Sequence, residues 1–120
     1  MPAEHVEEQP MSAQQLFDHI RRYLGEQFQL SPDQVKEMLP SFITTLATHM
    51  DNLEKSLGTG DPLVIGKAGH TIKGALLNLG LTEYAELAFR IEENGKSGDT
   101  NTDYPALVAS LRRMIEPLFR

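Results

Sequence analysis

The sequence contains no cysteine, which removes several classes of chemistry at once. Without a thiol there is no disulfide framework, no thiolate nucleophile and no Cys-ligated zinc. Positive charge is also scarce, because 11 Lys and Arg residues stand against 17 Asp and Glu residues and give a formal net charge of -6. An acidic chain repels nucleic acids and anionic membranes, so we expect a protein partner, no nucleic acid and no membrane.

Long apolar runs are absent as well. The N-terminus carries Glu4, Glu7 and Glu8 in place of the basic region of a signal peptide, and no stretch reaches membrane-spanning length. We therefore predict a soluble, cytoplasmic protein. The 120 residues, 40% of them hydrophobic, suffice for one modest core, which indicates a single domain.

Apolar residues recur with helical spacing along most of the chain. Residues 1–11 lack this spacing and mix Pro, Glu and Gln, so we predict a flexible tail there. Ser12 is a good N-cap for a first helix over residues 12–28. Its apolar stripe falls at every fourth position: Leu16, Ile20, Leu24 and Phe28.

Four further helices are predicted, over residues 31–58, 61–80, 82–95 and about 102–118. Pro40 should kink or divide the first of these, because proline lacks an N–H and crowds the preceding turn. Gly80 is expected to stop the second, and Thr82 to cap the third. No alternating strand pattern occurs, so the predicted fold class is all-α, with short loops that favour antiparallel neighbours.

The segment of residues 61–81 carries the chemistry. At about 100° per residue, His70 faces away from the apolar side of this helix. That side consists of Val64, Ile65, Ala68, Ile72, Ala75, Leu76 and Leu79. On the face of His70, Lys67 and Lys73 stand three residues away on either side, and Gly66 and Gly74 four residues away. Lysines there would bind a phosphoryl group attached to the imidazole.

The two glycines need an explanation of their own. A glycine within a helix costs about 1 kcal/mol relative to alanine. We interpret Gly66 and Gly74 as space that lets another protein approach the ring of His70, and close packing against a neighbouring helix as the competing interpretation. For Lys67, the alternative to binding a phosphoryl group is that it is an ordinary solvated lysine.

At this point the residues resemble a known family. The run from His70 to Gly74, followed by Asn78, Leu79 and Gly80, resembles the signature of histidine-containing phosphotransfer (Hpt) domains, which act in multistep phosphorelays. The similarity covers roughly residues 31–120. It implies an antiparallel four-helix bundle over that range. The predicted helix over residues 12–28 is then additional to the bundle, within one domain spanning residues 12–120.

The resemblance also implies roles for individual residues. His70 would be the phosphorylated residue, Lys73 would contact the phosphoryl group, and Gly74 would leave room for the receiver domain. Glu92 falls where members carry Gln or Glu hydrogen-bonded to the imidazole Nδ1, which leaves Nε2 as the nucleophile. Lys96 stands where some members have a further cation. If Glu92 does not contact the imidazole, it is an ordinary surface carboxylate, which is the competing interpretation.

The implied partners are the receiver domain of a response regulator and a hybrid sensor histidine kinase. The chain would be a phosphocarrier and not an enzyme, because no Gly-rich nucleotide-binding domain accompanies the bundle. It would need no cofactor, since the Mg²⁺ for transfer would belong to the receiver. We expect no metal site, because neither an HExxH nor paired ExxH motifs occur.

An apolar patch of Leu77 and Phe89 around His70 is expected to receive the partner. In the competing interpretation, the N-terminal helix covers Phe89. His5, His19 and His49 are expected to be solvated surface residues. A helical bundle that binds partners without transferring phosphate is the alternative function.

Overall fold

The computed structural model describes residues 11–120, and these are helical apart from short connections. The α-helices are α2 (Ala13–Phe28), α3 (Pro32–Ser56), α4 (Pro62–Asn78), α5 (Thr82–Lys96) and α6 (Tyr104–Ile115), with 3-10 helices η1 (Leu57–Thr59) and η2 (Glu116–Phe119). No strand occurs in this range, so the all-α prediction is confirmed. Most of the predicted tail, His5 included, lies outside the described residues, whereas Met11 is half-buried against the core.

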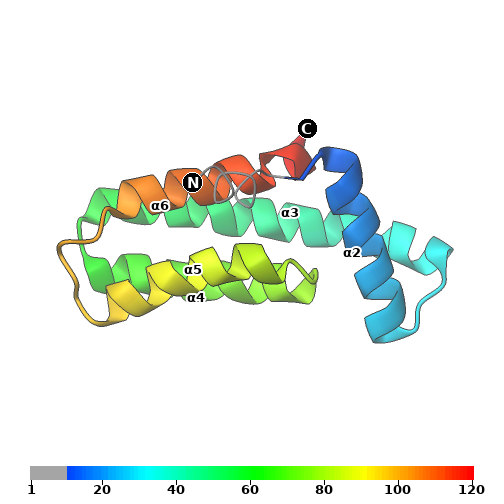
Figure 1. Cartoon of the computed structure of the whole chain (residues 1–120), viewed down its shortest axis with the longest axis horizontal. Helices are drawn as coiled ribbons and strands as arrows, with labels where there is room; N and C mark the ends of the chain where they lie inside the picture. Colours follow the sequence, from blue (N-terminus) through cyan, green and yellow to red (C-terminus); the bar gives the residue numbers. More distant parts are fainter. Residues whose placement is uncertain (1–10) are drawn as a thin grey trace, which may run out of the picture.

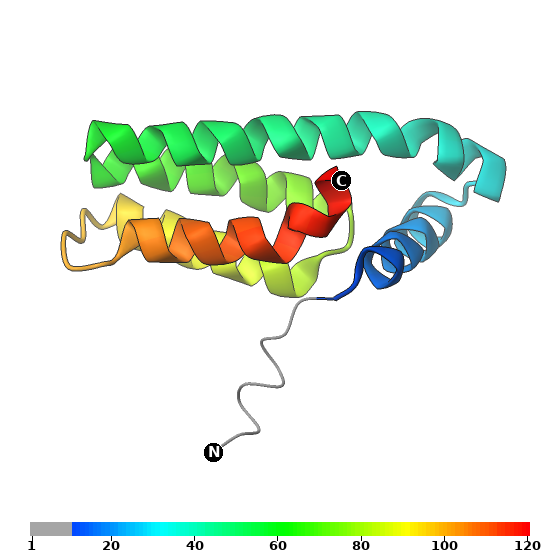
Figure 2. The same cartoon turned by 90° about the horizontal axis from the view of Figure 1, so that it is seen from above.

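Four helices run alongside one another in alternating directions. Figures 1 and 2 show α3, α4, α5 and α6 as an antiparallel bundle, with α2 crossing one end of it at a steep angle. The most extensive contact between two helices joins α4 to α5, while α2 packs mainly against α3 and η2. The predicted four-helix bundle with an additional N-terminal helix is therefore correct. No helix within residues 11–120 combines the length and apolar character that a membrane span requires.

Apolar side chains from all five α-helices meet in one core. Its fully buried members include Leu16, Ile20, Leu24, Leu46, Met50, Leu53, Ile72, Leu76, Ile91, Leu111 and Ile115. Phe28, which we placed on the buried stripe of α2, is 50% exposed. A spacing of four residues drifts by about 40° per step on a helix of 3.6 residues per turn, so the stripe has rotated out of the core by Phe28.

Polar caps set the starts of the helices. Ser12 and Ser31 each form a capping box with the glutamine three residues later. Thr82 is not a cap: it is the first residue of α5, and buried Leu81 occupies the N-cap position without a side-chain hydrogen bond. Burial of Leu81 outweighs the cap there, next to Gly80, whose φ of 74° ends α4 as predicted.

Pro40 does not divide α3, which is continuous from Pro32 to Ser56. The proline is exposed, so water can solvate the carbonyl that its missing N–H leaves free. Figure 2 shows the first turns of α3 inclined to the rest of the helix, which is the kink without the break. The last helix is shorter than predicted. It begins after Asp103, which caps Ala106, and gives way to η2 after Ile115.

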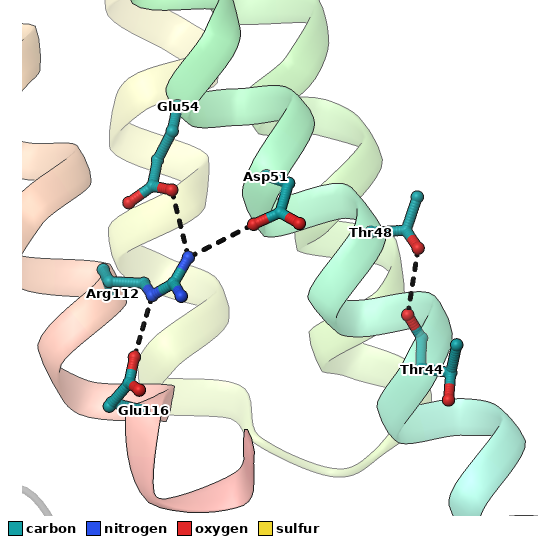
Figure 3. Close-up of polar contacts among 6 residues, drawn as sticks. All are labelled: Thr44, Thr48, Asp51, Glu54, Arg112 and Glu116. Atoms are coloured by element: carbon teal, nitrogen blue, oxygen red, sulfur yellow. Dashed lines mark hydrogen bonds and ion pairs between the residues drawn. The ribbon is translucent and has the colours of Figure 1, made fainter. Parts of the chain in front are cut away.

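Ion pairs between α3 and α6 add to the apolar contacts of the bundle. Figure 3 shows the guanidinium of Arg112 between Asp51 and Glu54 of α3, at 3.3 and 3.0 Å, and Glu116 at 2.8 Å. These carboxylates raise the pKa of Arg112, the hydrogen bond to Glu116 being the largest cause. Through Arg112 these ion pairs link α3 to the start of η2.

The additional helix α2 holds the turn between α4 and α5. His19, predicted to be solvated, is half-buried, and its Nε2 lies 2.6 Å from the carbonyl oxygen of Gly80. Since a carbonyl only accepts, Nε2 carries the proton and donates. Tyr23 packs so closely on Gly80 that no Cβ fits there. His19 and Tyr23 thereby tie α2 to the end of the helix that carries His70.

Candidate functional site

His70 lies at the middle of α4 and points out of the bundle. Asp61 starts this helix by accepting a hydrogen bond from the N–H of Leu63, and Ile72 and Leu76 bury the opposite face. The side chain of His70 is 62% exposed. Val64, which we placed on the buried face, is 40% exposed, because its position six residues before His70 puts it at the edge of that face.

Glu92 of α5 orients the imidazole. Its Oε2 lies 2.8 Å from Nδ1 of His70, and the carboxylate is only 2% exposed. An ionised carboxylate can only accept hydrogen bonds, so Nδ1 carries the proton and donates a hydrogen bond to Glu92. In the neutral imidazole the lone pair then lies on Nε2, and the ring is largely exposed, which is the arrangement a nucleophilic imidazole needs.

Two lysines share the same carboxylate. Nζ of Lys73 lies 2.7 Å from Oε1 of Glu92, and Nζ of Lys96 lies 2.7 Å from Oε2. The Lys73 contact is a close ion pair without the alignment of a hydrogen bond, so Oε1 keeps some capacity to accept another donor. Lys73 is 21% exposed, whereas Lys96 is 58% exposed and its pKa is raised by Glu92.

These cations keep Glu92 ionised. Burial raises its pKa, but the contacts with Lys73, Lys96 and His70 outweigh burial and lower the pKa to about 2. Lys73, which we predicted to contact a phosphoryl group, is therefore paired with Glu92 in this structure. Lys67 is exposed on the face of His70, one turn before it, and forms no ion pair within residues 11–120.

Comparison with known proteins shows the family to which this site belongs. The sequence model of one family, the Hpt domain, matches residues 37–119, which is more than half of the chain. The chain belongs to the Hpt domain family. Neither the curated proteins nor the solved structures gave a significant match. Hpt domains are phosphocarriers of phosphorelays, and the matched range contains α4, α5 and the whole cluster around His70 but not α2.

The glycines of this Hpt domain have different roles. Gly74 is exposed, and a Cβ placed on it would meet nothing within 4 Å, so space lies open beside His70. Our interpretation of Gly66 is wrong. It is buried, and its Cβ would lie 3.0 Å from the backbone nitrogen of Lys96 and 3.1 Å from the carbonyl oxygen of Glu92. Gly66 serves the close packing of α4 against α5.

Two more glycines, Gly69 and Gly95, belong to this crossing, and we did not predict their role. A Cβ on Gly69 would lie 3.1 Å from the backbone nitrogen of Glu92, and a Cβ on Gly95 would lie 2.5 Å from Cα of Gly66. The absence of these side chains lets the backbone of Glu92 rest on α4. The helix crossing therefore sets the distance between Glu92 and His70.

Exposed apolar residues surround the cluster. Leu77 is 43% exposed and Phe89 47% exposed, so neither is covered by α2. Leu63 and Val64 are also exposed at the start of α4, which we did not predict. The signal was available, since Leu63 precedes His70 by seven residues and shares its face. Residues 11–120 contain no cluster of His, Asp and Glu side chains that could hold a metal ion.

Proposed function

We propose that this Hpt domain accepts a phosphoryl group on Nε2 of His70 and exchanges it with an aspartate of a response-regulator receiver domain. A hybrid sensor histidine kinase is the proposed upstream source. The observation that carries the proposal is the hydrogen bond of Nδ1 to the buried carboxylate of Glu92. In the neutral imidazole this hydrogen bond leaves the lone pair on Nε2, and the side chain is 62% exposed, so a partner's phosphoaspartate can reach it.

The transfer follows from this tautomer. The lone pair of Nε2 attacks phosphorus, the N–P bond forms, and the P–O bond to the aspartate breaks and releases a carboxylate. The imidazole gains positive charge during attack, and Glu92, which accepts a hydrogen bond from Nδ1–H, stabilises that charge. Lys73 and Lys96, which share the carboxylate of Glu92, and Lys67, one turn before His70, supply positive charge for the phosphoryl oxygens.

The receiver is proposed to dock on the exposed patch formed by Leu77 and Phe89, with its active site over His70. Burying each of these side chains contributes roughly 1.5 to 3 kcal/mol, which suits a transient complex. Open space at Gly74 admits the receiver's loops. The Mg²⁺ that transfer requires is proposed to bind the receiver, so calorimetry on the isolated Hpt domain should detect no specific metal binding.

The proposal is tested by incubating the protein with phosphorylated receiver domains. We expect phosphate to leave the receiver and to appear on this chain as phosphohistidine, and Lys73→Ala to slow this transfer about tenfold, equivalent to about 1.4 kcal/mol. Incubation with Mg²⁺ and ATP alone should give no label. A chain that binds receivers and never takes up phosphate would support the alternative, a helical-bundle interaction module.

A further inference from the structure

The ring of Phe89 contacts the side chain of Lys73. The ammonium of Lys73 lies 5.0 Å from the centroid of the Phe89 ring, a distance at which a cation is attracted to the negative face of an aromatic ring. Phe89 belongs to the same turn of α5 as Glu92, three residues before it. The side chain that we assign to docking therefore also touches the lysine that follows His70 by one turn.

Lys73 is held from two sides by this one turn of α5. Glu92 contacts its ammonium at 2.7 Å, and the ring of Phe89 covers another side, so Lys73 is only 21% exposed. The two contacts differ in kind. A carboxylate neutralises the ammonium and competes with an incoming phosphoryl group, whereas an aromatic ring attracts the cation without carrying a net negative charge.

We propose that Phe89 is a positioning residue that keeps the Lys73 ammonium beside His70, ready for the phosphoryl group. This inference rests on the proposed function of His70. A lysine side chain has four rotatable bonds, and ordering it costs conformational entropy. The ring restricts Lys73 before the phosphoryl group arrives, so less of that cost falls on the transfer step.

Phosphoramidate, a small phosphoryl donor, separates positioning from docking because it needs no protein interface. In this reaction Nε2 of His70 attacks phosphorus, the N–P bond to the ring forms, and the P–N bond of the donor breaks and releases ammonia. The Nδ1 proton stays on the ring, hydrogen-bonded to Glu92. Only residues that act on the ring or the phosphoryl group should change the rate.

We expect Phe89→Leu, which keeps an apolar side chain, to lower the rate of His70 phosphorylation by phosphoramidate about two- to fivefold. Phe89→Tyr should react at the wild-type rate, because it keeps an aromatic face at this position. The matched control is Phe28→Leu. Phe28 is 50% exposed on α2, and no cation lies over its ring within residues 11–120. That variant should react as the wild type does.

The lysine is tested in a double-mutant cycle. In a Lys73→Met background, Phe89→Leu should have no further effect on the rate, because the ring then has no ammonium to hold. Phe89→Leu reacting at the wild-type rate, or slowing the Lys73→Met protein by the same factor as the wild type, would overturn the proposal.

A second readout does not depend on phosphotransfer. Protons on the terminal methylene of Lys73 should show an upfield ring-current shift by NMR in the wild type, and this shift should disappear in Phe89→Leu. If the wild type takes no phosphate from any donor, the proposed function fails, and the NMR shift still decides the position of Lys73. Equal shifts in both proteins would show that Phe89 does not hold the ammonium.

Discussion

The close crossing of α4 and α5 gives a sharp prediction at Gly66. Gly66→Ala adds a Cβ that would lie 3.0 Å from the nitrogen of Lys96, 3.1 Å from the carbonyl oxygen of Glu92 and 3.1 Å from the carbonyl carbon of Gly95. All three neighbours are backbone atoms, which cannot rotate away as the end of a side chain can. Helix α5 must therefore shift by a few tenths of an ångström, and Glu92 moves with it.

The expected loss of stability in Gly66→Ala follows from a comparison with Gly74→Ala on the same helix. Alanine gains about 1 kcal/mol over glycine through helix propensity at either position. Only Gly66→Ala adds the cost of overpacking, typically about 1 to 3 kcal/mol, because Gly74 has open space beside it. The propensity gain cancels in the comparison. We therefore expect the Gly66→Ala protein to be about 1 to 3 kcal/mol less stable than the Gly74→Ala protein.

Urea denaturation of the wild type and both variants, followed by far-UV circular dichroism, measures these free energies of unfolding. Gly74→Ala should be as stable as the wild type or more stable, yet should slow transfer from a receiver because it fills the space beside His70. Gly66→Ala should also loosen the hydrogen bond between Glu92 and His70, visible in the ¹⁵N shifts of the imidazole. Equal stabilities of the two variants would refute the argument that α4 and α5 meet backbone to backbone at Gly66.

Three further predictions concern single side chains. Since the folded pKa of Glu92 lies near 2 and its ordinary value is 4.5, its ionised form contributes stability that is complete above about pH 4.5 and is lost as the pH falls toward 2. Urea denaturation between pH 6 and pH 3 should therefore show a steeper loss for the wild type than for Glu92→Gln, and parallel curves would contradict the assignment. Arg112→Met should cost up to about 1 kcal/mol, less at high salt, because its ion pairs are partly exposed; a salt-independent loss would mean that packing dominates. Leu77→Asp should weaken receiver binding at unchanged melting temperature, and a variant that unfolds would place Leu77 in the core.

Much of the fold followed from the sequence because its signals are local. Ser12 was predicted as the N-cap of the first helix and caps α2, and Gly80 was predicted to end α4 and does so with a positive φ. The outward face of His70 followed from helical periodicity. Local signals gave wrong predictions where a contact with another part of the chain determines a residue's role. Thr82 lost its role as a cap because Leu81 is buried, and His19 contacts a carbonyl that is 61 residues away in the sequence.

The outline of the site could be predicted, and the family resemblance also predicted the hydrogen bond between Glu92 and His70, but the other contacts between α4 and α5 could not be predicted. The sequence placed Lys73 and Gly66 on the face of His70 through their spacing, but spacing along α4 contains no information about the position of α5. Gly66 therefore looked like space for a partner, whereas the backbone of α5 fills that space. For the same reason the contact between Lys73 and Phe89 could not be predicted, because it joins side chains of two helices.

The central claim is that His70 alone carries the phosphoryl group, and mapping the phosphorylated residue tests it most directly. The protein should be labelled by a phosphorylated receiver and by phosphoramidate, and the bond should be labile in acid and stable in base, as an N–P bond is. In His70→Gln we predict no label, with the helical circular dichroism unchanged because the side chain is 62% exposed. Label that persists in His70→Gln, on His5, His19 or His49, would contradict this account.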